Sequence, residues 1–103
     1  MGHFVEKQPT ERLTVSIDLT PRLLSGVTIS SVAASAKTFS TGEDATNTML
    51  QSTTGAASGN YARVTLKAGQ SDGAKYLVKI LSTLSNSDVI ESDLEVEIKE
   101  ELI

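Results

Sequence analysis

The sequence contains no cysteine and a single histidine, His3, and these shortages remove most of the side chains that catalysis and metal binding use. Without thiols the chain has no disulfides, thiolate nucleophiles or sulfur ligands, which fits a reducing compartment. A Ser-His-Asp arrangement would have to use His3 from near the chain end, and no serine lies in a Gly-x-Ser-x-Gly motif. We therefore predict that the protein is not an enzyme and has no catalytic, cofactor-binding or metal-ligating residues. His3 is interpreted as part of a frayed tail or a tag remnant.

Aromatic residues and long hydrophobic runs are also scarce. Phe, Tyr and Trp make up 4% of the residues, and tryptophan is absent, so a core has to be built mainly from Val, Ile, Leu and Ala. No apolar stretch approaches the ~18 residues that a transmembrane helix needs. The segment Met1 to Phe4 has neither the basic nor the apolar region of a signal peptide. These absences predict no membrane association and synthesis in the cytoplasm.

Positive charge is the third shortage. Lys and Arg together number 9 against 13 Asp and Glu, which gives a formal net charge of −4, and the basic residues do not cluster. Such a chain repels phosphate backbones, so we expect no nucleic-acid partner. The length of 103 residues, 39% of them hydrophobic, fits one domain with one core. We expect this domain to span residues 1–103, with residues 1–6 as a disordered tail or residues 4–7 as a short first strand.

A two-residue period of aliphatic side chains runs through most of the sequence and predicts β-strands. The main strands are expected at residues 12–19, 27–37, 61–68, 75–81 and 90–99. The last of these has the cleanest alternation, with Ile90, Ser92, Leu94, Val96 and Ile98 on one face. Short strands separated by turn residues at regular intervals predict an all-β fold, a single antiparallel β-sandwich domain of about seven strands.

The first half of the chain gives weaker signals. In residues 27–37 we expect Val27, Ile29, Ser31 and Ala33 to share one face, with Val32 on the other. The preceding Thr20 is expected to cap a single helical turn that has Pro21 at its first position and that Gly26 ends.

Two further segments complete this reading of the first half. Residues 46–51 predict a short strand that carries Met49 or Leu50 inward. Residues 52–59, which are small, polar and glycine-rich, predict a mobile loop.

Four acidic residues on the solvent side of the last strand, Glu91, Asp93, Glu95 and Glu97, form the most conspicuous charge feature. Successive members are about 6.6 Å apart on an extended strand, so they form a line and not the closed oxygen cage that calcium requires. If the preceding strand lies beside them, Lys75 and Lys79 face these acids as cross-strand charge pairs. Defence of an edge strand and binding of a basic partner are the other uses that the pattern allows.

Two leucines of the preceding strand, Leu77 and Leu81, lie on the face opposite Tyr76, Val78 and Ile80. They leave two alternatives open. If nothing covers them within the monomer, they form an exposed apolar patch that marks an interface. If they are covered, the strand is a central one with two buried faces. The candidate interface residues are therefore Leu77, Leu81, Lys79, Glu91, Asp93, Glu95 and Glu97.

Several spacings taken together resemble a family of proteins. They are Lys7-x-Pro9-x-Glu11, Leu13-x-Val15-x-Ile17-Asp18, Leu23-x-x-Gly26-x-x-Ile29 followed by Ser30-Ser31-Val32, and Val64-x-Leu66-x-x-Gly69-x-x-x-Gly73-x-x-Tyr76-x-Val78. Over roughly residues 7–99 the chain is similar to small immunoglobulin-like β-sandwich proteins from tailed-phage and prophage structural gene clusters, of the tail-fibre adaptor or virion accessory type. Ala33-Ala34-Ser35 stands where such proteins commonly carry a tryptophan.

This resemblance implies an immunoglobulin-like sandwich without catalytic residues or cofactors. It implies a non-enzymatic phage or prophage virion structural or assembly module, whose partners are other virion structural proteins, further copies of itself, or both. The protein would then be made in the cytoplasm and end in the virion. The alternative is an immunoglobulin-like adhesive or carbohydrate-binding domain, for which the available aromatic side chains are Phe4, Phe39, Tyr61 and Tyr76.

Overall fold

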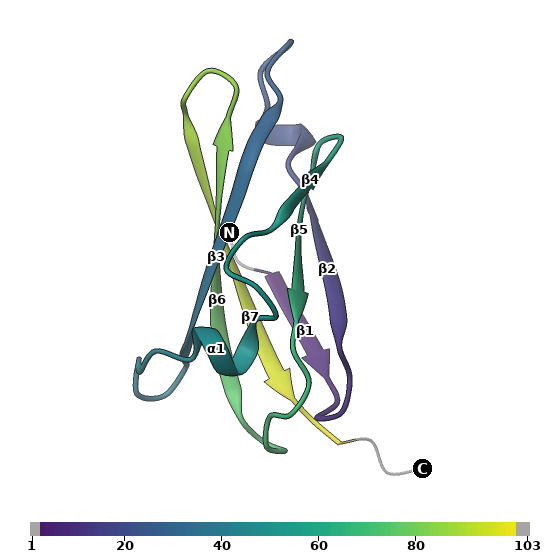
Figure 1. The fold of residues 1–103 in the computed structure, drawn as a ribbon, viewed down its shortest axis with the longest axis vertical. Helices are drawn as coiled ribbons and strands as arrows, with labels where there is room; N and C mark the ends of the chain where they lie inside the picture. The colour runs from purple at the N-terminus through teal and green to yellow at the C-terminus, as the bar shows by residue number, and fades with distance from the viewer. Residues whose placement is uncertain (1–2, 101–103) are drawn as a thin grey trace.

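The computed structural model describes residues 3–100, which fold into two β-sheets packed face to face, as Figure 1 shows. The strands are β1 (His3–Lys7), β2 (Leu13–Asp18), β3 (Ile29–Thr38), β4 (Ala56–Ser58), β5 (Tyr61–Leu66), β6 (Lys75–Leu84) and β7 (Val89–Ile98). A 3₁₀ turn, η1 (Thr20–Arg22), and a one-turn helix, α1 (Thr46–Met49), lie between them. The predicted all-β sandwich of seven strands is confirmed.

The strands are distributed over a four-stranded sheet, β1-β7-β6-β3, and a three-stranded sheet, β2-β5-β4. Lettered A to G along the chain, these sheets are A-G-F-C and B-E-D. In the seven-stranded immunoglobulin constant type the first strand lies beside the second instead. The two arrangements therefore share the placement of the last six strands and differ in the first.

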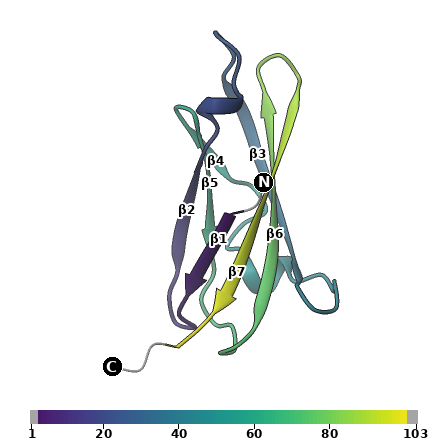
Figure 2. The ribbon, with the colours of Figure 1, turned by 180° about the vertical axis from the view of Figure 1, so that it is seen from behind.

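The pairing of β1 with β7 is parallel, whereas every other strand pair between the seven strands is antiparallel. The two strands come from opposite ends of the chain, so no tight hairpin has to join them, and Figure 2 shows them side by side. The predicted antiparallel sandwich therefore contains one parallel pair. His3 and the following residues to Lys7 belong to this strand, and residues 1–2 lie outside the described part of the chain.

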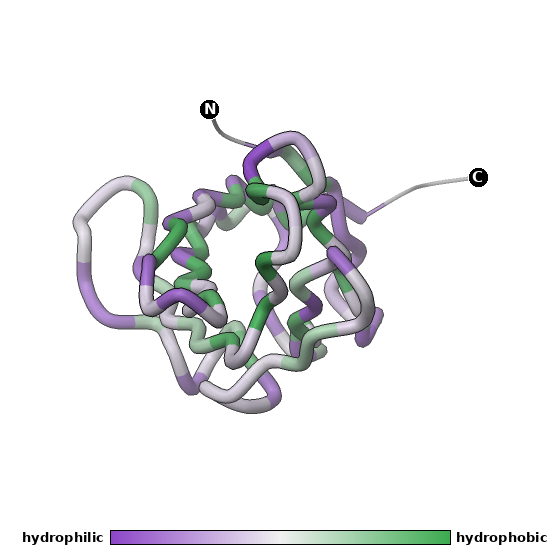
Figure 3. Tube along the Cα trace, turned by 90° about the horizontal axis from the view of Figure 1, so that it is seen from above, coloured by the Kyte–Doolittle hydropathy of each residue, from purple (hydrophilic) through white to green (hydrophobic). Residues whose placement is uncertain are grey.

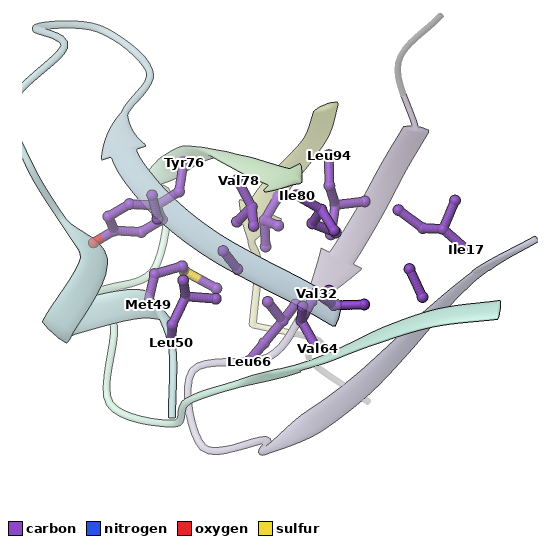
Figure 4. Packing of buried hydrophobic residues seen from close by; sticks show 14 of the residues in the cluster. Ile17, Val32, Met49, Leu50, Val64, Leu66, Tyr76, Val78, Ile80 and Leu94 are labelled. Carbon is purple, nitrogen blue, oxygen red and sulfur yellow. The ribbon is translucent and has the colours of Figure 1, made fainter. Parts of the chain in front are cut away.

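The core is aliphatic, as the shortage of aromatic residues requires. Alternate residues of β5, β6 and β7 point between the sheets, and Val78, Ile80, Leu94 and Val96 are fully buried. Tyr76 is the one aromatic side chain in the buried cluster of the described residues. Figure 4 shows side chains from both sheets meeting in this layer. Seen from the end of the sandwich, hydrophobic and hydrophilic residues alternate along the strands (Figure 3).

The inward face of β3 differs from the predicted one. The register against β6 shifts between Ile29 and Ser31, and this bulge inserts one extra residue. After it, Val32, Ala34 and Ala36 point into the core, while Ser31 and Ala33 point outward. A one-residue slip exchanges the two faces of a strand, so Ile29 points inward like Val32, and its predicted grouping with Ser31 and Ala33 is wrong.

Residues 46–59 also depart from the prediction. Residues 46–49 form α1 instead of a strand, and both Met49 and Leu50 are buried. The segment expected to be a mobile loop contains β4, which pairs with β5. Just before β4, the backbone bonds to the edge of β3: Ala34 N donates to Thr53 O at 2.8 Å, and Gly55 N donates to Val32 O at 2.9 Å. These bonds cover an edge that would otherwise offer unpaired groups.

The turn after β2 is present but is built differently from the prediction. Thr20 lies inside η1, and Leu19 precedes the turn without a side-chain cap. The stabilising acceptor is Asp18, whose Oδ1 accepts from Thr20 N at 2.9 Å and from Thr20 Oγ1 at 2.6 Å. These bonds lower the pKa of Asp18 below its usual value. The turn ends at Arg22, before Gly26.

Lys7, the last residue of β1, is a buried lysine that takes part in a hydrogen-bond network. Lys7 is only 1% exposed, and its Nζ donates to Gln8 O and to Gln70 Oε1, both at 2.8 Å. Gln70 Nε2 in turn donates to Thr48 O at 2.8 Å and to Lys67 O at 2.6 Å. Burial lowers the pKa of Lys7, and the nearby Glu11 carboxylate partly opposes this shift. The network ties β1 and α1 to the β5–β6 connection.

Candidate interaction surface

The outer surface of the four-stranded sheet is the best candidate for a functional site. We call it the four-stranded face and define it by the outward residues of its strands: Phe4 and Glu6 of β1, Glu91, Asp93, Glu95 and Glu97 of β7, Lys75, Leu77, Lys79 and Leu81 of β6, and Ser35 and Lys37 of β3. Their neighbours along each strand are buried between the sheets. Strand alternation therefore places these side chains on one surface.

All seven residues singled out from the sequence lie on this face. The register of β6 with β7 sets Leu77 opposite Glu95, Lys79 opposite Asp93, and Leu81 opposite Glu91. The antiparallel hairpin brings the acidic row and the lysine row together as the sequence predicts. The structure thus unites the candidate residues, while their use as an interface remains a prediction.

The acids and lysines form cross-strand ion pairs. Lys75 Nζ lies 3.8 Å from Glu97 Oε2, and Lys79 Nζ lies 3.7 Å from Glu91 Oε1. At these distances and exposures each pair contributes only about 0.2–1 kcal/mol. Asp93 and Glu95 form no ion pair with another described residue. The middle of the acidic row therefore keeps its charge available to a partner.

The apolar side chains of the face are partly open to solvent. Leu81 is 37% exposed and Phe4 is 55% exposed, while Leu77 is half-buried. Strand β6 is central in its sheet, yet no segment of the described residues 3–100 fully covers its outer side chains. Each of the two alternatives for Leu77 and Leu81 therefore holds in part. The strand is central, as one alternative requires, but its outer face is not covered and forms an apolar strip, as the other requires.

A hollow of about 430 Å³ interrupts the face beside the loop after β3. Lys37, Leu77 and Asp93 contribute to its lining, together with Asp44. Asp44 Oδ1 accepts from Thr46 Oγ1 at 2.7 Å and from Thr46 N at 3.2 Å, and these bonds lower the pKa of Asp44. Its carboxylate is therefore ionised at neutral pH and adds negative charge to the rim.

The geometry of the acidic row does not assemble a metal cage. Within residues 3–100, no group of three or more His, Cys, Asp or Glu side chains converges to hold an ion. None of the helices in that part of the chain is long and apolar enough to cross a membrane. The chemistry that the face offers is charge, hydrogen bonding and apolar contact.

Sequence reasoning missed several members of the face. Phe4 and Glu6 reach it because β1 pairs in parallel with β7, which sets Phe4 beside Glu95 and Glu6 beside Glu97. Their own alternation with Val5 and Lys7 was the available signal. Lys37 was missed because the bulge in β3 reverses the faces of that strand. Lys99 Nζ approaches Glu6 Oε2 at 3.8 Å and extends the charged edge.

Comparison with known proteins gives one family. Residues 7–97 match the family model described as podophage GP4 fiber-tail adaptor protein gp77. The match covers most of the chain, including β2 to β6 and nearly all of β7. No curated protein matches the sequence.

Proposed function

Because this chain belongs to the family of the podophage GP4 fiber-tail adaptor protein gp77, we propose that it is a non-enzymatic structural module of a phage tail that acts through protein–protein contacts. The contact surface in this proposal is the four-stranded face. Its partners are other virion structural proteins, and its place of action is the virion.

The observation that carries the proposal is the pair of partly exposed leucines, Leu77 and Leu81, which alternate with lysines on the outer side of β6 beside the acidic row of β7. Stable interfaces combine apolar contacts with polar and charged groups, and β6 presents both kinds of side chain on the outer side of a central strand. The hydrogen bonds that cover the outer edge of β3 favour contact through the face over addition of a strand at that edge.

Replacement of the apolar strip tests the proposal. In a phage that encodes this chain, Leu77→Lys/Leu81→Lys introduces two charges at the centre of the face. We expect particles with fewer attached tail fibres and lower infectivity, because a buried unpaired charge weakens an interface strongly. Fibres would be counted by electron microscopy of purified particles.

Two variants separate this effect from misfolding. Leu24→Lys places the same substitution on a leucine that is 70% exposed in the loop after η1 and is not a member of the four-stranded face, and it should leave fibre number unchanged. Leu81→Lys alone changes the more exposed of the two leucines and should keep the fold, as circular dichroism can verify. Normal fibre number and infectivity with a folded Leu81→Lys variant would contradict the proposal.

A further inference from the structure

The sandwich has a second outer surface with a different character. We call it the three-stranded face and define it by the outward residues of β2, β5 and β4 and the basic residues that flank them: Thr14, Ser16 and Asp18, Tyr61, Arg63 and Thr65, Ala56 and Ser58, with Arg12 and Lys67. Most of its polar groups are neutral hydroxyls. Arg12, Arg63 and Lys67 stand against the single carboxylate of Asp18, so this face has an excess of two positive charges.

The four-stranded face has the opposite sign. Its strands carry five carboxylates, on Glu6 and the acidic row, against three ammonium groups, on Lys37, Lys75 and Lys79. The flanking Asp44 and Lys99 cancel each other, which leaves an excess of two negative charges. Sheets in a sandwich lie about 10 Å apart, so the two surfaces point in opposite directions. The molecule is therefore electrically polar across its thickness.

The three-stranded face also has two side chains, Tyr61 and Arg63, that are suited to anchor a partner. Tyr61 and Arg63 are two residues apart on β5 and point to the same side, where they line a hollow of about 230 Å³ with Ser16 and Ser58. Arg63 additionally lines a neighbouring hollow of about 310 Å³ with Gln51 and Thr65. Within residues 3–100 the Arg63 guanidinium forms no ion pair. Tyr and Arg are the residue types that most often dominate binding energy in interfaces.

We propose that copies of this chain associate head to tail, with the four-stranded face of one copy docked on the three-stranded face of the next. In this arrangement Asp93 and Glu95, which lack ion-pair partners within the described chain, meet Arg63 and Lys67 of the neighbouring copy. The apolar strip of Leu77 and Leu81 packs against the Tyr61 ring. This inference rests on the proposed function only in using the four-stranded face as a contact surface.

Charge decides between this arrangement and a symmetric dimer. A two-fold dimer places the same surface of both copies together, so it would stack two negative faces or two positive faces. A head-to-tail contact pairs opposite signs in every interface and leaves one complementary face exposed at each end. Such a heterologous contact closes into a ring or extends as a filament.

Sedimentation velocity of the purified chain, over a range of concentrations at low and high NaCl, tests the proposal. We expect self-association that weakens at high salt, because exposed charges are screened beyond about 8 Å at physiological ionic strength. Arg63→Glu/Lys67→Glu makes the three-stranded face negative, and Asp93→Lys/Glu95→Lys makes the four-stranded face positive, so each variant has two faces of the same sign. Each should raise the dissociation constant on the order of 100-fold, since like charges in an interface repel strongly.

The most decisive measurement is made on a mixture of the two variants. In the mixture every face again finds one of opposite sign on the other variant, so association should return with equal amounts of both chains. Asp93→Asn/Glu95→Gln removes the charge more gently if the lysine variant is unstable, and it should weaken association less. Ser25→Lys and Ser25→Glu each add one charge, of either sign, to an exposed loop and should leave association unchanged.

A wild-type chain that stays monomeric at every concentration and salt level would overturn the inference, as would Arg63→Glu/Lys67→Glu with unchanged association. A mixture that fails to reassociate would do the same. These outcomes leave the proposed function standing if Leu81→Lys still removes fibres from particles. If Leu81→Lys leaves the fibre number normal while the wild-type chain still self-associates, the proposed function alone is overturned.

Discussion

At the scale of single residues, the sharpest constraint lies at Gly55, where the chain leaves the edge of β3 to form β4. A Cβ atom at this position would lie 2.6 Å from Arg63 O and 2.6 Å from Val32 Cγ1. One of these contacts is backbone and cannot move without disturbing β5. The glycine is required here by the close approach of two sheets and not by an unusual backbone angle.

Gly55→Ala should therefore lower the free energy of unfolding by about 1–3 kcal/mol, the cost of inserting a methyl group into a packed site. Chemical denaturation of the purified protein measures this change. Ala57→Ser, a similarly small substitution on exposed β4, should change stability by less than about 0.5 kcal/mol. Equal stability of Gly55→Ala and the wild type would show that the backbone at Gly55 is packed less tightly against Arg63 and Val32 than described.

Asp44 is a second informative residue, because its pKa is lowered by the hydrogen bonds from Thr46. Its folded pKa lies below its unfolded value, so its contribution to stability is present above the unfolded pKa and is lost as pH falls through the folded pKa. Asp44→Asn should flatten the acid limb of the stability–pH curve below about pH 4. Thermal melts across acidic pH measure this slope. An Asp44→Asn curve parallel to the wild type throughout that range would rule out the contribution.

At the scale of elements, β1 is held by the buried network of Lys7 and Gln70. Removal of one partner leaves a buried acceptor without its donor. Lys7→Met should lower the free energy of unfolding by about 1–3 kcal/mol for this reason, and the loss should shrink in a Gln70→Leu background because the two side chains interact. Denaturant unfolding of the two single variants and the double variant measures the coupling.

Lys75→Met is the control for Lys7→Met, because it makes the same substitution at an exposed lysine. Lys75 is exposed and forms a surface ion pair with Glu97, so its replacement should cost less than about 1 kcal/mol. If Lys7→Met were no more destabilising than Lys75→Met, the buried network would not hold β1 in place.

The elements also show how far sequence reasoning reaches. β5 and β7 were predicted well, because their aliphatic residues alternate without interruption, from Ala62 to Leu66 and from Ile90 to Ile98. β3 was predicted as a strand, but the bulge after Ile29 reversed its faces. Bulges depend on pairing with a distant strand, and small residues such as Ala33 and Ala34 fit either face, so local pattern could not reveal it.

Tertiary contacts explain the other misses. The segment 52–59 is polar and rich in small residues, yet it is ordered by hydrogen bonds to β3 and by pairing with β5. The buried Lys7 could not be read from sequence, because lysine is almost never fully buried without a partner and its partner Gln70 is distant along the chain. The acidic row and its lysines were found because a hairpin brings neighbouring strands together in register.

At the scale of the whole molecule, the two sheets carry opposite charge on their outer surfaces, although the chain as a whole has a formal net charge of −4. Each face combines charge with apolar or aromatic side chains, around Leu81 on one side and Tyr61 on the other. A small sandwich with two such faces can contact two neighbours at once. This geometry suits a component that joins parts of an assembly.

The most direct test of the central claim, that the four-stranded face is a contact surface in the assembled tail, is zero-length carbodiimide cross-linking of intact particles followed by mass spectrometry. This reagent joins carboxylates to lysines that already touch. Asp93 and Glu95 should be joined to a lysine of another chain, and Lys67 of a second copy is the first that we expect, because it lies on the opposite side of the sandwich from the acids in its own chain. Cross-links from Asp93 and Glu95 only to Lys75 and Lys79 of the same chain would contradict the account.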